Sequence, residues 1–481
     1  MSHELSEFLK TAGVQFIRVL WCDNANIIRG KAFHISGFHE HREYGIGISM
    51  AQQAIPVMYD AVAPNSGLGP VGEVWLVPDW STLRILPYAP THARVMGNMM
   101  HQGNPWSLCP RYFLKRMLAA AQAQGLEVMA AFENEFYLLQ PGTKGPVPAD
   151  DTVFASTLAM DLNREVIDEI ASALIAQEIP VERYYPESGP GQHELSVRYT
   201  TALQAADQQI AFRETVRAIA LRHHLKASFL PKIFADKAGN GCHLHLSLWQ
   251  NGKNVVPGGE DIATRGKEKK EGEEFPVLSS QSSDSIQNLT LNSQNTSHPP
   301  SLSGIARSFI AGMLDHLPAL MALTTPSPNS YRRIRPHFWS GAFRAWGWDN
   351  REAAVRVPTN PAPPSPTHFE LKTVDAAANP YLALGAVIAA GLDGIQRELD
   401  PGDPVTVDPG TLSETERAAG RIDRLPENLG EAIAHLSQNK TLLNALNPDL
   451  AQAYLAVRSA EWEAMQHLDL SEEVKLLLDR Y

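Results

Sequence analysis

The feature that most constrains this fold is a strict two-residue alternation in residues 242–248, which read CHLHLSL. In an extended strand, His243, His245 and Ser247 fall on one face, and the three intervening leucines fall on the other. The strand therefore needs an apolar core on one side and polar partners on the other. A lone His-x-His pair is more often a satisfied pair on a sheet face, so other segments must decide whether this face is functional.

Helical and strand-like patterns follow one another without the regular alternation that is typical of a doubly wound sheet. Runs rich in β-branched and aromatic residues predict strands near residues 128–139, 193–199, 242–250, 353–357 and 368–373. Helical periodicity predicts helices over about 161–177, 202–226, 304–323, 380–398 and most of 427–480. We therefore expect an α+β fold whose large sheet is antiparallel and flanked by helices.

The N-terminal part of the chain has a different character from the rest. Residues 11–100 contain strand-like runs and almost no helical pattern. We expect a small β-rich N-terminal domain over 1–105 and a large second domain over 106–481. Gly, Ser, Gln, Asn and charged residues dominate 257–300, which predicts a disordered insertion within the second domain.

Charge and cysteine content exclude several classes of protein. The 481 residues carry a net charge of −12, so neither a nucleic-acid surface nor an anionic-membrane surface is expected. The cysteines, Cys22, Cys109 and Cys242, are sparse and lack metal-type spacing, which indicates a reducing compartment. The N-terminus has no apolar signal core, and the apolar run 381–392 is too short to span a bilayer. We therefore expect a cytoplasmic protein that binds neither nucleic acid nor membrane.

Carboxylates recur in three other strand-like or turn-like segments. Two glutamates stand two residues apart in AFENEFYLL (131–139), two flank a Gly-Pro-Gly turn in YYPESGPGQHELSV (184–197), and one lies in THFELKTVD (367–375). Each segment alone is more simply a solvated polar face. If the segments converge with His243, they form an oxygen-rich site suited to Mg²⁺ or Mn²⁺ rather than zinc. The predicted metal ligands are Glu133, Glu135, Glu187, Glu194, His243 and Glu370.

Residues 329–358 contain six arginines and no lysine, against two carboxylates, in a chain that is acidic overall. Surface ion pairs with the acidic remainder would explain such a cluster. However, Trp339, Trp346 and Trp348 interleave with it and predict that much of the segment is buried, so that its arginines need anionic partners. Arginines beside a site for divalent cations are what phosphoryl transfer requires, although no Walker-type glycine-rich lysine loop is present.

Together these motifs resemble those of the glutamine synthetase family. FENEF, ESGPGQHE, PKIFADKAGNGCHLHLS, NSYRRIRP, DNREAAVRVP and FELKTVDAAANPYLAL occur in the family's order over about residues 130–392. The resemblance implies a β-grasp-like N-terminal domain and a catalytic domain whose curved antiparallel sheet forms half of a funnel, with ATP entering at one end and glutamate at the other. It also implies a homo-oligomeric double ring of ten or twelve subunits.

The resemblance further implies roles for individual residues. It assigns one metal ion, Mg²⁺ or Mn²⁺, to Glu135, Glu187 and Glu194 and a second to Glu133, His243 and Glu370. It assigns ATP to Glu182, His245, Ser247 and Arg356, glutamate to Gly239, Arg333 and Lys372, and catalysis to Arg333, Arg351 and Arg356. The implied reaction uses ATP to convert glutamate into γ-glutamyl phosphate, which an amine or ammonia then attacks.

Two departures from the family pattern bear on the second substrate. Ammonia-using members carry an aspartate in an N-terminal loop and a glutamate in a flap after the NSYRR motif. Here the loop region, 47–55, has no acid, and Trp339 lies about where the flap glutamate falls. An aromatic residue there can pack against an organic amine, so we expect a γ-glutamyl amide as the product. Two alternatives stay open: a glutamine synthetase that uses ammonia, and a silent nucleotide- or metal-binding homologue, which Ala238 and Lys372 in place of the family's usual asparagine and arginine would favour.

Overall fold

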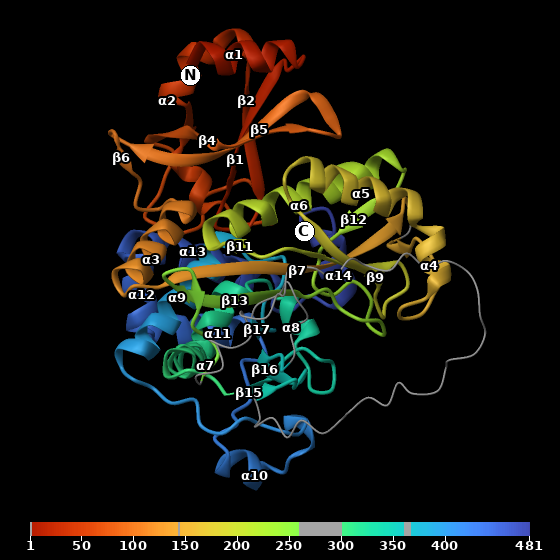
Figure 1. The fold of residues 1–481 in the computed structure, drawn as a ribbon, viewed down its shortest axis with the longest axis vertical. Coiled ribbons are helices and arrows are strands. Elements are labelled where there is room, and N and C mark those ends of the chain that lie inside the picture. The colour runs from red at the N-terminus through yellow and green to blue at the C-terminus, as the bar shows by residue number, and fades with distance from the viewer. Residues whose placement is uncertain (1, 143–144, 259–300, 360–366) are drawn as a thin grey trace, which may run out of the picture.

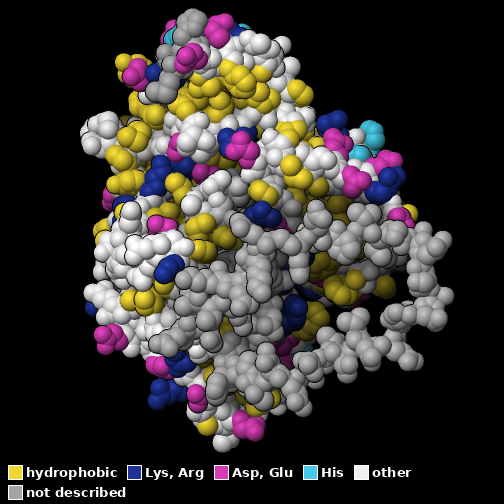
Figure 2. Space-filling model, viewed as in Figure 1, with side chains coloured by type: hydrophobic (Ala, Val, Ile, Leu, Met, Phe, Trp, Pro, Cys, Tyr) yellow, Lys and Arg dark blue, Asp and Glu magenta, His cyan; other side chains and the backbone are white. Residues whose placement is uncertain are grey.

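The computed structural model describes residues 2–142, 145–258, 301–359 and 367–481. Their strands form two sheets, one in the N-terminal part and one in the larger remainder, as Figure 1 shows from red to blue. The predicted α+β class is confirmed. The prediction of a disordered insertion at 257–300 lies outside the described residues, apart from its first two. On the face drawn in Figure 2, acidic and basic side chains are interspersed, and hydrophobic side chains gather over the N-terminal part.

The N-terminal sheet has the strand order β2-β1-β5-β4-β3, with the short strand β6 added to β5. Strand β1 runs parallel to β5, and the other neighbours pair antiparallel. Ile17 and Val19 of β1 alternate toward a core that also contains Leu9 of α1 and Phe38 of α2. The elements are α1 Ser2–Thr11, β1 Phe16–Cys22, β2 Ile28–His34, α2 Phe38–Tyr44, β3 Ile46–Ser49, β4 Glu73–Leu86, β5 Ala89–His101 and β6 Asn104–Pro105.

Helix α2 lies in the stretch for which the sequence predicts almost no helical pattern. Its seven residues, FHEHREY, bury only Phe38, so the apolar period that would indicate a helix is missing. Gly45 ends the helix with φ 75°, and a Cβ at this position would lie 2.2 Å from the carbonyl oxygen of Leu76. Packing against β4 therefore places this helix, and its own sequence pattern does not reveal it.

The larger sheet follows the order β15-β16-β17-β13-β7-β10-β9. Every neighbouring pair in this order is antiparallel except the edge pair β15 and β16, so the predicted antiparallel sheet is confirmed apart from that pair. The strands are β7 Glu127–Gln140, β8 Val147–Pro148, β9 Val181–Pro186, β10 Gln192–Val197, β11 Thr200–Thr201, β12 Lys226–Ser228, β13 Cys242–Gln250, β14 Lys253–Asn254, β15 Phe343–Trp348, β16 Ala353–Val357 and β17 Phe369–Leu371.

Helices pack on the apolar face of this sheet. Leu244, Leu246 and Leu248 of β13 are buried in one core with residues of α7 and α9. No helix of the described ranges is both long and apolar enough to cross a membrane. The helices are α3 Pro110–Ala123, α4 Thr157–Leu162, α5 Arg164–Ala176, α6 Ala202–Arg222, α7 Gly304–Thr324, α8 Ser330–Arg333, α9 Pro380–Gln396, α10 Glu414–Ala419, α11 Leu429–Gln438, α12 Lys440–Leu446, α13 Pro448–Met465 and α14 Leu470–Leu477.

The strand register places polar residues of four strands side by side on the other face. Glu133 of β7 lies opposite His243 of β13. His245 lies opposite Glu370 of β17, and Glu370 lies opposite Arg356 of β16. Residues directly opposite each other, and residues two apart on one strand, project from the same face of a sheet. The fold therefore gathers these side chains into one polar row on the face opposite the leucines.

Candidate active site

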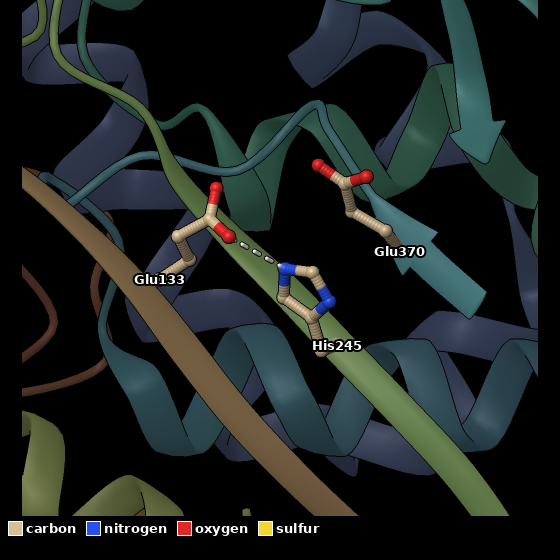
Figure 3. Close-up of side chains that lie close together, drawn as sticks. All are labelled: Glu133, His245 and Glu370. Carbon is tan, nitrogen blue, oxygen red and sulfur yellow. Dashed lines mark ion pairs between the residues drawn. The ribbon is translucent and has the colours of Figure 1, made fainter. Parts of the chain in front are cut away.

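At the centre of the polar row, two histidines lie between two carboxylates. Nδ1 of His243 is 3.2 Å from Oε1 of Glu133 and 3.2 Å from Oε1 of Glu370. Nε2 of His245 is 3.3 Å from Oε2 of Glu133. Figure 3 shows Glu133, His245 and Glu370 projecting from β7, β13 and β17. One ligand atom from each of these three lies within 4.8 Å of the others, a spacing that can hold a metal ion.

Cations balance the buried carboxylate of Glu370. Nη1 of Arg356 donates to its Oε2 at 2.9 Å, and Nζ of Lys372 donates to its Oε1 at 3.2 Å. Burial alone would raise the pKa of Glu370, but Lys372 and the two histidines outweigh burial and hold this pKa below its usual range. The histidines likewise keep the pKa of Glu133 well below its usual value. Both carboxylates are therefore charged at neutral pH.

A second group of carboxylates continues the row along β7 and β10. Glu194 lies directly opposite Glu135 in the sheet, and Glu187 precedes the turn that leads into β10. Burial, together with the charges of Glu133 and Glu135, raises the pKa of Glu194 to about 10. Burial also raises the pKa values of Glu135 and Glu187. Like charges at this proximity disfavour ionisation, and a bound cation would offset this repulsion.

The donor set and the space around it fit a hard divalent cation. Carboxylate oxygens dominate the row, and Mg²⁺ and Mn²⁺ prefer such ligands. The backbone N–H of Gly241 donates to Oε2 of Glu135 at 2.8 Å. A Cβ at Gly241 would lie 2.7 Å from Nε2 of His243 and 3.0 Å from Oε1 of Glu135. Glycine at position 241 therefore leaves space for an ion between these groups, and any other residue would reduce that space.

A pocket opens beside Glu133 and His245. Oγ of Ser247, in its wall, accepts a hydrogen bond from Nε1 of Trp249 at 2.9 Å. The ring of Tyr199 stacks on Trp249, with centroids 6.4 Å apart. Apolar walls with a few polar groups at one end are typical of small-molecule sites. The pocket is lined by Met129, Ala131, Phe132, Glu133, Glu182, Arg183, Ser196, Val197, Tyr199, His245, Leu246, Ser247 and His368.

Arg333 lies buried against Gly239, and its charge acts on Glu135 of the row. Nη2 of Arg333 donates to the carbonyl oxygen of Val374 at 2.9 Å, and its Nε is buried without a hydrogen-bond partner in the described part of the chain. A Cβ at Gly239 would lie 2.5 Å from the carbonyl oxygen of Pro231 and 2.8 Å from Cγ of Arg333. A side chain at position 239 would therefore displace the guanidinium.

Two family models match almost the whole sequence. The model described as "Glutamine synthetase N-terminal domain" matches residues 2–106, and "Glutamine synthetase, catalytic domain" matches 107–268 and 268–476. The chain belongs to the glutamine synthetase family. Enzymes of this family depend on ATP and a divalent metal ion, act on glutamate with ammonia or an amine, and are typically oligomeric.

Relatives within the glutamine synthetase family carry names of two kinds. Gamma-glutamylpolyamine synthetase GlnA3 of Streptomyces coelicolor is 35% identical over 473 residues, which cover 97% of this chain and 93% of the relative. Type-1 glutamine synthetase 1 of Dictyostelium discoideum is 31% identical over 496 residues, covering 98% and 91%. A solved chain described as "GmaS/ADP complex-Conformation 1" has a TM-score of 0.79 and 27% identity, with 100% of both chains covered.

The resemblance to the glutamine synthetase family, inferred from the motifs, is thus confirmed, whereas the roles of single residues stay predictions. The structure brings the predicted metal ligands of β7, β10, β13 and β17 onto one face. His245, which the resemblance assigns to the phosphates, also contacts Glu133 and offers a ligand atom within 4.8 Å of ligand atoms of Glu133 and Glu370. His245 is therefore a candidate metal ligand beside His243.

The expectation that tryptophans bury the arginine-rich segment is only partly right. Trp346 is 2% exposed, whereas Trp339 is 58% exposed. Trp346 belongs to β15 and faces the core, but Trp339 lies in the loop before that strand. The exposed Arg351 places its guanidinium carbon 5.8 Å from the centre of the Trp339 ring. Outside a regular element, no periodicity distinguishes a core indole from one at the surface.

Two residues of the site are absent from the sequence-based assignments. Tyr185 lies beside the carboxylates of Glu187 and Glu194, and burial together with the charge of Glu194 raises the pKa of its hydroxyl. Tyr185 stands two residues before Glu187, so the strand period in YYPES could have indicated it. Gly241 makes room beside His243, and this close approach depends on neighbouring strands, so no local pattern could have indicated it.

Proposed function

We propose that this chain is an ATP- and metal-dependent ligase that joins the γ-carboxylate of glutamate to a primary amine. The observation that carries the proposal is the polar row, in which carboxylates, imidazoles and a guanidinium share one sheet face beside a pocket. Membership of the glutamine synthetase family supports the same class of reaction.

The row would hold Mg²⁺ or Mn²⁺ and the phosphates of ATP. One ligand set would be Glu133, His243 and Glu370, and the other Glu135, Glu187 and Glu194. The ions would neutralise the triphosphate and leave the γ-phosphorus open to attack. His245 and Arg356 adjoin the first set and would face the phosphates. Ser247 and Glu182 line the neighbouring pocket, which would take the nucleoside.

The reaction would proceed in two steps. An oxygen of the γ-carboxylate attacks the γ-phosphorus and ADP leaves, with Gly239, Arg333 and Lys372 holding glutamate and Arg351 and Arg356 stabilising charge on the transferring group. The amine nitrogen then attacks the acyl carbon of γ-glutamyl phosphate, and phosphate leaves as the nitrogen loses a proton. Phosphorylation comes first because an unmodified carboxylate oxygen is a poor leaving group.

Two features favour an organic amine over ammonia. Residues 47–55 contain no acid, and Trp339 presents an exposed ring where the resemblance places the flap glutamate of ammonia-using members. An indole packs against hydrocarbon and attracts an ammonium group to its face. The relative named gamma-glutamylpolyamine synthetase agrees with this preference.

The proposal extends to assembly and location. A homo-oligomeric double ring of ten or twelve subunits fits a family whose members are typically oligomeric. The three cysteines are buried and unpaired, as expected in the reducing cytoplasm. Light scattering on the purified protein tests the assembly, and a monomer or dimer would contradict the double ring.

The function is tested with ATP, glutamate, Mg²⁺ or Mn²⁺, and a panel that contains ammonia, methylamine, butylamine, putrescine and spermidine. Phosphate release gives the rate, and mass spectrometry identifies the amide. We expect at least one organic amine to exceed ammonia in kcat/KM by about tenfold or more, which corresponds to about 1.4 kcal/mol in transition-state binding.

The two other candidate functions predict different results in the same assay. Turnover with ammonia and with no organic amine would identify a glutamine synthetase. ATP binding without ATP cleavage under any condition would identify a silent homologue. The silent homologue is considered because the resemblance expects arginine at position 372. Lys372 lacks the planar fork with which arginine binds a carboxylate, and it forms an ion pair with Glu370.

A further inference from the structure

The loop of residues 335–340, between α8 and β15, is anchored by a buried glutamate to which the proposed reaction gives no role. Glu352, in the turn before β16, is 7% exposed. Its Oε1 accepts a hydrogen bond from the backbone N–H of Trp339 at 2.8 Å. Its Oε2 is buried and has no hydrogen-bond partner among the described residues. A buried, half-satisfied carboxylate is unfavourable, so its presence calls for a reason.

The loop is strained at the point where Glu352 holds it. His337 (φ 63°) and Trp339 (φ 54°) both have left-handed backbone, which L residues rarely adopt. Such conformations persist only where surrounding contacts determine them, and they cluster at functional sites. Oγ of Ser340 donates to the carbonyl oxygen of Arg335 at 2.8 Å and accepts from the N–H of Arg335 at 2.9 Å. Ser340 thus closes the ends of the loop, and Glu352 fixes the strained residue before it.

The tip of the loop presents two aromatic rings, each over a cation. Phe338 and Trp339 are both 58% exposed. Nζ of Lys232 lies 5.8 Å from the centre of the Phe338 ring, and the guanidinium carbon of Arg351 lies 5.8 Å from that of Trp339. Arg351 directly precedes Glu352 in the chain. One short segment therefore anchors the backbone of the loop and contacts its outer ring.

The loop borders the end of the site where Arg333 lies. It follows α8, whose last residue is Arg333, and Arg333 packs against Gly239 and acts on Glu135. Lys232, beside Phe338, has its pKa lowered by burial and by the charges of Arg335 and Arg333, so it belongs to the same end. The pocket beside Ser247 is lined from β7, β9, β10 and β13 instead. The two rings thus lie on the side where an amine would meet the γ-carboxylate.

We propose that Glu352 is a positioning residue that fixes the loop 335–340 so that Phe338 and Trp339 select amines carrying a hydrocarbon group. This inference rests on the proposed function. Aromatic faces pack against alkyl groups, and ammonia offers no such surface. Glu352 acts through Trp339 and touches no substrate. Without its hydrogen bond, the strained backbone relaxes, the rings lose their fixed positions, and the preference for the larger amine disappears.

Kinetics of two variants test the selection. Glu352→Ala removes the acceptor, whereas Glu352→Gln keeps an oxygen for the Trp339 N–H. The second exchange is mild because burial raises the pKa of Glu352, so that this side chain takes up a proton more readily than an exposed glutamate. Glu463→Ala, at an exposed position of α13, is the matched control. KM and kcat are measured with butylamine, with ammonia, with glutamate and with ATP.

In Glu352→Ala, we expect KM for butylamine to rise about tenfold, with kcat and KM for ATP changed by less than about twofold. KM for ammonia is unchanged, and Glu352→Gln restores KM for butylamine to within about twofold of wild type. Equal losses for butylamine and ammonia, or a loss confined to kcat, would overturn the selection. Circular dichroism checks that each variant is folded.

Hydrogen–deuterium exchange of the peptide that contains 335–340 tests the anchoring without turnover. We expect exchange about tenfold faster in Glu352→Ala than in wild type and Glu352→Gln. Unchanged exchange overturns the inference whatever the ligase does. A wild-type protein that turns over neither amine nor ammonia overturns the proposed function, and amine selection with it, while faster exchange in Glu352→Ala would still identify the anchor. The two failures are therefore distinguishable.

Discussion

The polar row of the large sheet and the loop 335–340 would serve the same reaction, yet they are built in opposite ways. On the row, Glu133, His245 and Glu370 project from three adjacent strands whose other face is packed with buried leucines. In the loop, Phe338 and Trp339 are exposed on a strained backbone that is held by single contacts of Glu352, Ser340 and Asp408. Strand pairing and core packing fix the side chains of the row, whereas few contacts fix the aromatic side chains of the loop.

The difference indicates how the work of the enzyme is divided. Chemistry that every substrate needs, such as cation and phosphate binding, benefits from rigid strands, whereas selectivity is more easily altered on loops. We expect changes on the row to reduce every activity together. Changes in the loop are expected to redistribute activity among amines.

The largest effect is expected from Glu133→Ala. This change removes a carboxylate from the centre of the row, so that His245 loses its carboxylate contact and His243 keeps only Glu370. Phosphate release should fall about 1,000-fold or more with every amine, a loss of about 4 kcal/mol in transition-state stabilisation. Glu127→Ala, at the exposed start of the same strand, is the control and should behave like wild type. If Glu133→Ala kept its activity with one amine and lost it with another, the proposed division between the row and the loop would be wrong.

Divalent cations are expected to stabilise the folded protein by binding to the row. Mg²⁺ or Mn²⁺ at about 100 times its Kd should add about 2.7 kcal/mol to the free energy of unfolding. Thermal scans with metal and with a chelator measure the resulting rise in Tm. Glu133→Ala should reduce the rise by removing a ligand of the first set, whereas Trp339→Ala should preserve the whole rise. Loss of the rise in the loop variant would show that the two regions are coupled.

A smaller effect is expected from Trp339→Ala. Removing the indole should lower the ratio of kcat/KM for butylamine to that for ammonia about fivefold, because an aromatic contact of this kind contributes about 1 kcal/mol. Trp339→Phe keeps an aromatic face and should retain most of the ratio. Competition between the two amines in one reaction, read by mass spectrometry, measures it directly. An unchanged ratio would remove the loop from substrate selection.

The smallest effect is expected from replacing 259–300 by a short Gly-Ser turn. Pro257 pairs with Leu302 in an antiparallel bridge, and the N–H of Gly258 donates to the carbonyl oxygen of Ser301 at 2.7 Å. Because the ends of the segment already meet, closing them should cost little, and kcat/KM should change by less than about twofold. Steady-state kinetics and light scattering test this. Loss of activity or of the oligomer would show that the segment is needed for catalysis or for assembly.

The sequence predicts the row far better than the loop, for a physical reason. Alternation in β13 and in the Glu-x-Glu run of β7 specifies which side chains share a face, because the period of a strand is two. The register that sets Glu133 opposite His243 depends on two distant strands, so it emerges only in the fold. The spacing of residues could not predict that these strands meet in one site. That prediction came from the order of the motifs, which resembles the order in the glutamine synthetase family.

The loop offers no comparable period. The resemblance places Trp339 at the flap, but its exposure contradicts the burial that the neighbouring tryptophans suggest. Glu352 looks like an ordinary surface acid in the sequence, and its burial follows from contacts with the loop itself. Left-handed backbone at His337 and Trp339 is likewise set by tertiary contacts, since it is uncommon for residues other than glycine and no local pattern indicates it.

The alternation of β13 also limits how a lineage of such proteins can diverge. Adding or deleting one residue within this strand would turn Leu244 and its fellow leucines into the cavity and drive His243 and His245 into the core. This sheet can therefore evolve by exchanging residues one at a time, but not by changing the length of its central strand. Changes in the length of the loop 335–340 are therefore a more accessible route by which related proteins acquire new substrates.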